Sequence, residues 1–191
     1  MSYRAVVVGG SAGGLEALKV ILDGLPTSFR LSLLVVQHLH PRDGGCFAQC
    51  LAGMTRLPVL EPSDKERIRP GYVYVAPANY HMLVERTQTI ALSITEKVNW
   101  SRPSIDVLFE SAAIAWKNSL ISLVLSGAND DGAQGTRVVR AAGGLTLVQD
   151  PQDAQSPFMP QAAIDTGAVN EVLPTKKIAP RLINLALGCK M

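Results

Sequence analysis

The sequence alternates short, continuously apolar segments with amphipathic ones, and this alternation constrains the fold more than any other feature. Three runs rich in Val, Leu and Ile predict strands: residues 4–10, 31–37 and 120–126. Segments with the apolar spacing of helices follow them at 13–24, 45–54 and 132–142. Strands that are apolar throughout are typical of a parallel sheet covered on both faces. We therefore expect an α/β fold: a single doubly wound, mostly parallel sheet with helices on both faces.

The middle of the chain departs from this alternation. Three short strand-like runs lie close together: residues 72–76, 82–85 and 89–95. Residues 86–88 have the composition of a hairpin turn, so we expect a short antiparallel insert between residues 72 and 95. A helix over 104–118 follows, whose start Ser101 or Ser104 could cap. Later strands are predicted at 145–149 and 169–173, and later helices at 160–166 and 176–187.

Composition narrows the class of protein. The chain has 191 residues, of which 47% are apolar and 18% charged, and this composition excludes a disordered chain. The length predicts one domain over residues 1–191. Eighteen basic and 16 acidic residues leave a net charge of +2, which gives no electrostatic reason to expect nucleic-acid binding. No apolar run approaches the roughly 18 residues of a membrane span, so we expect no membrane insertion.

The three cysteines indicate neither a disulfide framework nor a metal site. Cys46 and Cys50 lie four residues apart in an expected helix, and Cys189 is near the end of the chain. No C-x-x-C pair occurs, and no histidine has the spacing of a zinc ligand. We therefore expect free, buried thiols in a reducing cytoplasm.

The first candidate site follows the first predicted strand. Gly9, Ser11 and Gly13 form a G-x-S-x-G pattern at a strand-to-helix turn. A nucleophile on so sharp a turn needs neighbours without bulky side chains, and the helix N-terminus then favours developing negative charge. The competing interpretation is a phosphate-binding loop. It is disfavoured because Ser11 stands where G-x-G-x-x-G requires glycine, and no Walker lysine follows.

A histidine and two acids follow neighbouring predicted strands. His38 comes directly after the second strand, within reach of Ser11 if the two strands are adjacent, so it is a candidate general base. His40 and His81 are less well placed. Asp130 and Asp131 follow the strand at 120–126, and either could orient the imidazole. The alternative for both acids is helix capping.

Several ordered motifs resemble one known family, the catalytic domain of the CheB-type chemotaxis protein-glutamate methylesterases. The resemblance covers about residues 6–174. Its segments are Val-Gly-Gly-Ser-Ala-Gly-Gly at 8–14, Val-Val-Gln-His at 35–38, Pro-Gly-Tyr-Val-Tyr-Val-Ala-Pro at 70–77, Arg-Pro-Ser-Ile-Asp-Val-Leu-Phe at 102–109, Leu-Ser-Gly at 125–127 with Asp-Gly-Ala at 131–133, Gln-Asp-Pro at 149–151, and Met-Pro at 159–160 followed by Ala-Ile at 163–164.

The resemblance implies a Ser-His-Asp hydrolase without metal or cofactor. It makes Ser11 the nucleophile and His38 the general base, and it selects Asp131 over Asp130 as the orienting acid. The implied reaction removes methyl esters from glutamate side chains of chemoreceptor-like proteins in the cytoplasm, with deamidation of glutamines as a further activity.

Two departures from the family pattern bear on this expectation. Typical members have Gly-Met-Gly where this chain has Gly127, Ala128 and Asn129, which predicts a changed pocket. Typical members also carry an N-terminal receiver domain, whereas this sequence starts directly at the catalytic domain, so we expect either a stand-alone enzyme or a fragment. Two alternatives to the methylesterase stay open: a hydrolase acting on a different ester, with its pocket changed at Ala128 and Asn129, and a regulatory module without activity.

Overall fold

The apolar runs of the sequence form the strands of one sheet. The structure, a computed structural model, describes residues 3–188. Within these residues seven parallel strands lie in the order β3 (Val59–Leu60), β4 (Val73–Val75), β2 (Ser32–Gln37), β1 (Ala5–Gly10), β7 (Leu120–Val124), β8 (Leu145–Gln149) and β9 (Glu171–Leu173). The central strands β1, β2, β4 and β7 are buried along their whole length, as expected for a sheet covered on both faces.

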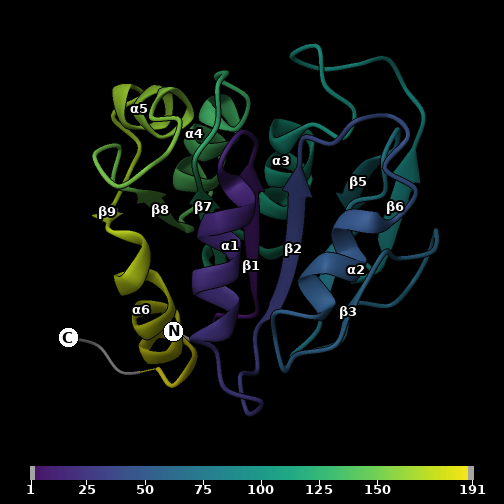
Figure 1. The fold of residues 1–191 in the computed structure, drawn as a ribbon, viewed down its shortest axis with the longest axis horizontal. Helices are drawn as coiled ribbons and strands as arrows, with labels where there is room; N and C mark the ends of the chain where they lie inside the picture. Colours follow the sequence, from purple (N-terminus) through teal and green to yellow (C-terminus); the bar gives the residue numbers. More distant parts are fainter. Residues whose placement is uncertain (1–2, 189–191) are drawn as a thin grey trace.

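Helices cover both faces of this sheet (Figure 1). One core cluster contains residues of α1 (Gly14–Asp23), α2 (Cys46–Ala52) and α6 (Thr175–Ala186). The other contains residues of α3 (Ile105–Trp116), α4 (Ala133–Ala141) and α5 (Phe158–Asp165); the short 3-10 helix η1 (Lys117–Ser119) follows α3. The expected doubly wound α/β fold is therefore confirmed.

The antiparallel insert is smaller than the sequence predicts. Among the strands of the described residues, only β5 (His81–Val84) and β6 (Ile90–Ser93) pair in antiparallel fashion. The strand expected at 72–76 is instead β4, which pairs in parallel with β2 and is a central part of the main sheet. Its side chains are fully buried, and such burial is typical of a parallel strand between two layers. The two-residue strand β3 was not expected.

The two described cysteines also differ from expectation. Cys46 and Cys50 are free but exposed, not buried. They lie on the outer face of α2, because Phe47, Ala48 and Leu51 form its buried face. Cys189 lies outside the described residues. Among residues 3–188, no helix combines the length and apolar character that crossing a bilayer requires.

Strand order identifies the edge at which a ligand site is expected. From β1 the chain first builds β2 and β4 on one side, and later builds β7, β8 and β9 on the other. The order therefore reverses at β1. Open α/β sheets bind ligands outside the carboxyl ends of their strands at such a point. The loops after β1, β2 and β7 all meet there (Figure 1).

Candidate active site

The loop after β1 presents Ser11 at the start of α1. The Ser11 N–H donates to the carbonyl of Ser126, 2.9 Å away, and Gln37 Nε2 donates to the Ser11 carbonyl at 2.6 Å. Gly13 has a left-handed φ of 78°, and a Cβ there would lie 2.6 Å from the Cβ of Gln155. Only glycine meets both demands without strain. The G-x-S-x-G pattern is thus used for a tight strand-to-helix turn.

His38 leaves the sheet at the same edge. Its N–H donates to the Gly10 carbonyl at 3.1 Å, which extends the ladder between β1 and β2 by one residue. Its side chain is 14% exposed, and Nε2 lies 2.8 Å from Asp131 Oδ2. Within residues 3–188 the Ser11 hydroxyl makes no hydrogen bond to His38. The structure therefore joins His38 to Asp131 and brings Ser11 to the same edge, without a direct bond between Ser11 and the ring.

The Asp131 carboxylate is fully buried and surrounded by donors. Its five hydrogen bonds come from His38 Nε2 (2.8 Å) and the Ile105 N–H (2.7 Å) to Oδ2, and from the Ser104 hydroxyl (2.9 Å), the Asp106 N–H (3.1 Å) and Asn99 Nδ2 (2.9 Å) to Oδ1. The two backbone donors belong to the first turn of α3, so the carboxylate also lies at the positive end of a helix.

These donors keep Asp131 ionised. Burial by itself raises the pKa of the carboxyl, but hydrogen bonds from His38, the Ile105 N–H and other donors outweigh it, and the pKa lies below its ordinary value. An ionised carboxylate can only accept, so the proton of the neutral imidazole sits on Nε2. The other ring nitrogen, Nδ1, is then free to take a proton from a hydroxyl.

A second buried carboxylate lies behind Asp131. Asp106 Oδ1 accepts the N–H groups of Gly132 (2.9 Å) and Gly135 (2.6 Å), and Oδ2 accepts Asn99 Nδ2 at 2.7 Å. Burial is the main cause that raises the pKa of Asp106 to about 6; the Gly135 N–H opposes this, and the charge of Asp131 adds to it. The two acids therefore form a coupled pair.

Backbone groups around Ser11 offer donors for an oxyanion. The Ser126 hydroxyl donates to the Ala12 carbonyl at 2.7 Å and accepts the Ser156 N–H at 2.8 Å, which ties three loops together. The N–H groups of Ala12 and Ala128 donate no hydrogen bond within residues 3–188. Both are thus available to a developing negative charge next to the Ser11 loop.

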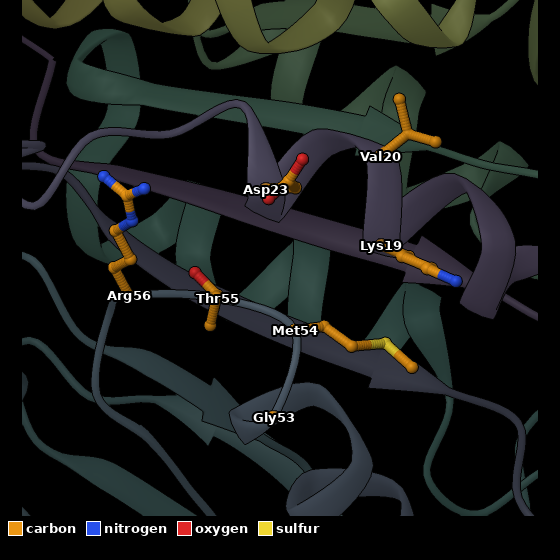
Figure 2. Close-up of a pocket in the computed structure, with 7 residues that line it drawn as sticks. All are labelled: Lys19, Val20, Asp23, Gly53, Met54, Thr55 and Arg56. Atoms are coloured by element: carbon orange, nitrogen blue, oxygen red, sulfur yellow. The ribbon is translucent and has the colours of Figure 1, made fainter.

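Two open cavities lie near the sheet, at different distances from Ser11. One, of about 530 Å³, borders the Ser11 loop and is lined by Ala128, Gln155, Ser156, Pro157, Phe158 and Gln161. The other, of about 550 Å³, is drawn in Figure 2 and lies between the C-terminal half of α1 and the segment after α2. Ser11 precedes the opposite end of α1, so the cavity in Figure 2 does not adjoin the candidate site. The first cavity does, and so does a smaller one of about 220 Å³ that is lined in part by Gly13 and Gln155.

Among residues 3–188, the other candidate side chains form no hydrogen bond with the side chain of Ser11, His38 or Asp131. Asp130 is exposed and makes no side-chain hydrogen bond within residues 3–188. His40 is also exposed, and its Nδ1 accepts the N–H of Arg42 at 3.2 Å. His81 is buried in β5, where its Nδ1 accepts the N–H of Ser104 at 3.2 Å. Asp131 does cap a helix, but it caps α3 rather than the helix that follows it.

Sequence reasoning missed three residues that surround Asp131. Ser104 was expected as a possible helix cap, but its hydroxyl donates to Asp131 instead. Asp106 stands in the first turn of a helix, a position common for acids, so no local pattern indicates its contacts with Gly132 and Gly135. Asn99 carries no local signal at all. Among residues 3–188, no three His, Cys, Asp or Glu side chains gather as a metal ion requires.

Comparison with known proteins points to one family. Residues 6–182 match the family described as CheB methylesterase. A relative from Leptospira interrogans is 46% identical over 185 residues, which cover 97% of this chain and 96% of the relative. A Pseudomonas aeruginosa relative named protein-glutamate methylesterase/protein-glutamine glutaminase 2 is 39% identical over 186 residues; the chain covers 53% of its length.

A solved structure is similar over almost the whole chain. The catalytic domain of the Thermotoga maritima CheB methylesterase superposes with a TM-score of 0.92 at 33% identity, covering 97% of this chain and 100% of that one. The family match spans most of the sequence, and the fold agrees from β1 to α6. The chain therefore belongs to the CheB methylesterase family.

Proposed function

We propose that this chain is a serine hydrolase that removes methyl esters from glutamate side chains of chemoreceptor-like proteins. In this proposal Ser11 is the nucleophile, His38 the general base and Asp131 the orienting acid. The observation that carries it is the 2.8 Å hydrogen bond between His38 Nε2 and the buried Asp131 carboxylate, at the edge of the sheet where Ser11 emerges. The same chemistry would convert glutamine amides to glutamates.

The first half of the reaction forms an acyl-enzyme. Ser11 Oγ attacks the ester carbonyl while His38 Nδ1 takes the hydroxyl proton. The carbonyl oxygen becomes an oxyanion, for which the N–H groups of Ala12 and Ala128 are candidate backbone donors. The tetrahedral intermediate collapses, the bond to the methoxy oxygen breaks, and His38 returns its proton to the leaving methanol.

The second half frees the glutamate. A water molecule gives its proton to His38 Nδ1 and attacks the acyl carbon, after which the bond to Ser11 Oγ breaks and the proton returns to the serine. When the substrate is a glutamine amide, ammonia leaves in place of methanol. Throughout, the ionised Asp131 stabilises the doubly protonated ring that forms in each half.

Methanol release measures this function directly. Ser11→Ala should abolish release from a methylated chemoreceptor, because no hydroxyl remains to be acylated. Ser28→Ala is a matched control: it changes an exposed serine that makes no hydrogen bond within the described residues, and its rate should equal that of the wild type. Unchanged release by Ser11→Ala would remove the nucleophile assignment, and a folded wild type that an organophosphonate does not label at Ser11 would contradict activity altogether.

One observation favours a second candidate, hydrolysis of a different ester. The cavity of about 530 Å³ beside the Ser11 loop is lined by Ala128 and by Phe158, which is 60% exposed. A small side chain at 128 leaves room for an acyl group bulkier than a glutamyl chain. Turnover of small hydrophobic esters, with no methanol release from methylated receptors, would support this candidate over the first.

We further propose that the chain acts as one catalytic domain in the cytoplasm. The single sheet that joins both core clusters supports one domain. The exposed, unpaired thiols of Cys46 and Cys50 support a reducing compartment, since exposed cysteines are readily oxidised elsewhere. Alkylation of both thiols in intact cells, before lysis, would test this location.

A further inference from the structure

One amide side chain lies between the two buried carboxylates. Asn99 Nδ2 is 2.7 Å from Asp106 Oδ2 and 2.9 Å from Asp131 Oδ1. An amide nitrogen carries two N–H bonds, so it can donate one to each acid. Among residues 3–188, no lysine or arginine forms an ion pair with either carboxylate. The Asn99 amide is therefore the group that separates two adjacent negative charges.

The amide reaches these acids from an exposed loop. Asn99 has a left-handed φ of 51°, a conformation that asparagine tolerates better than most residues. Its neighbours Val98 and Ser101 exchange backbone hydrogen bonds of 3.2 and 2.9 Å. On the far side, the Arg102 guanidinium donates to the carbonyls of Ile94 and Thr95, both at 2.8 Å. The loop between β6 and α3 is thus held in the one shape that aims Asn99 inward.

The electrostatics of the pair depend on this donor. The hydrogen bond from Asn99 lowers the pKa of both carboxyls, against burial, which raises both. The groups facing the pair are His38 after β2, the backbone N–H groups of Gly132 and Gly135 before and in α4, and His81 of β5 through the Ser104 N–H. Loss of the amide removes a donor that no other side chain replaces.

We propose that Asn99 is a positioning residue of the reaction, which keeps both acids ionised so that Asp131 can accept the hydrogen bond of His38. Without Asn99, the pair would bind a proton at neutral pH, and Asp131, which would share that proton with Asp106, would accept a weaker hydrogen bond from His38. This inference rests on the proposed function, and it adds a residue that acts through Asp131 without touching the substrate.

The test is the pH profile of kcat for hydrolysis of a small activated ester, from pH 5 to pH 9. Asn99→Gly removes the amide and accommodates the left-handed backbone. Its activity should fall about fivefold at pH 6 and about twofold at pH 7 and match the wild-type rate by pH 9, because the acid side of the profile moves from about 6, the pKa of Asp106 in the pair, to about 7. KM should change little, since the Asn99 amide donates to the two carboxylates.

Two further variants make the outcome decisive. Ser101→Ala changes a residue of the same loop. The hydroxyl that it removes donates only to the Asn99 carbonyl, at 3.2 Å, so the pH profile of this variant should match that of the wild type. Asn99→Asp has the same size as the native residue but replaces a donor with an acid, and should move the acid side further up. A loss that is equal at every pH, in either Asn99 variant, would show a structural role only and would overturn the proposal.

The same assay can refute the proposed function independently of the role of Asn99. If Ser11→Ala hydrolyses the ester as fast as the wild type, the triad itself is wrong. If Ser11→Ala is inactive while both Asn99 variants keep the wild-type profile, the triad stands and the role of Asn99 is refuted. Thermal unfolding of each variant shows that the compared proteins are folded at the assay temperature.

Discussion

Replacing Asp131 by Asn changes almost no volume but breaks the pattern of donors around it. Five donors converge on the carboxylate, and an amide offers only one oxygen to receive them. With the amide oxygen in place of Oδ1, its NH₂ group faces the Ile105 N–H and His38 Nε2. In the reverse orientation the NH₂ group faces three donors. The first orientation is therefore favoured, at the cost of one unpaired backbone N–H.

Both stability and rate follow from that orientation. A buried N–H left without an acceptor costs about 1–3 kcal/mol, so the free energy of unfolding should fall by that amount. His38 Nε2 would now have to accept from the amide, which moves the ring proton to Nδ1. The nitrogen proposed to take the Ser11 proton would then already carry one and could not act as a base. Substitutions of this kind lower kcat by about 10⁴-fold.

Ester hydrolysis and guanidinium unfolding of the same samples measure the two effects of Asp131→Asn. Asp130→Asn is the matched control, because Asp130 is exposed and its carboxylate has no hydrogen bond among the described residues. Its rate should stay within about twofold and its stability within about 0.5 kcal/mol of the wild type. The reasoning is refuted if Asp131→Asn keeps more than a tenth of the wild-type kcat, or if Asp130→Asn loses as much.

Two more predictions concern the turn and the acid pair. Gly13→Ala should destabilise the protein by more than the roughly 1–2 kcal/mol that a left-handed alanine costs, because its Cβ would also clash with Gln155. Gly167→Ala is the control, since Gly167 is also left-handed but a Cβ there would meet no atom within 4 Å. If thermal unfolding shows that the two variants lose equal stability, the clash with Gln155 is contradicted. Asp106 has a folded pKa of about 6, above its unfolded value, so the folded state binds its proton more tightly and its contribution to stability becomes less favourable as pH rises through 6. Between pH 8 and pH 5 this titration should add about 1 kcal/mol to the free energy of unfolding, a gain that denaturant titrations should find missing in Asp106→Asn.

The fold was predictable where an element carries its own pattern. The runs that became β1, β2 and β7 are apolar on both faces, which is enough to indicate parallel strands under two layers. The three residues of β4 are too few to show whether their partner runs parallel or antiparallel, and their nearness in sequence to the β5–β6 hairpin suggested the wrong partner. The prediction that Cys46 is buried was wrong for a similar reason, since a helix of two turns is too short for its sequence to show which face is buried.

The candidate site likewise contains residues that the sequence indicates and residues that it does not. Ser11, His38 and Asp131 follow three strands, and the strand order β2–β1–β7 makes their loops neighbours. That follows from connection rules that apply to any doubly wound sheet. The contacts of Asn99 and Asp106 depend instead on how α3 packs against α4, which no local pattern records. Sequence reasoning can therefore find the proposed reacting groups, while the groups that surround them require the packed structure.

The packing of α3 against α4 also links catalysis to stability. Asp131 stands just before α4 but caps α3, through the N–H groups of Ile105 and Asp106. Asp106 stands in α3 but caps α4, through the N–H groups of Gly132 and Gly135. Each acid therefore satisfies the free donors of the other's helix, and the proposed orienting acid is fixed by the contacts that join the two helices.

Because the two acids cap each other's helices, only some variants can separate the effect of an acid on the reaction from its effect on stability. A change at Asp131 or Asp106 alters the fold and the site together, because each removes a helix cap along with a charge. Asn99 caps neither helix; its side-chain donors go to the two carboxylates. Variants at Asn99 can therefore change the protonation of the pair while both helix caps remain, and their pH profiles, more than rates at one pH, distinguish the chemistry of this site from its architecture.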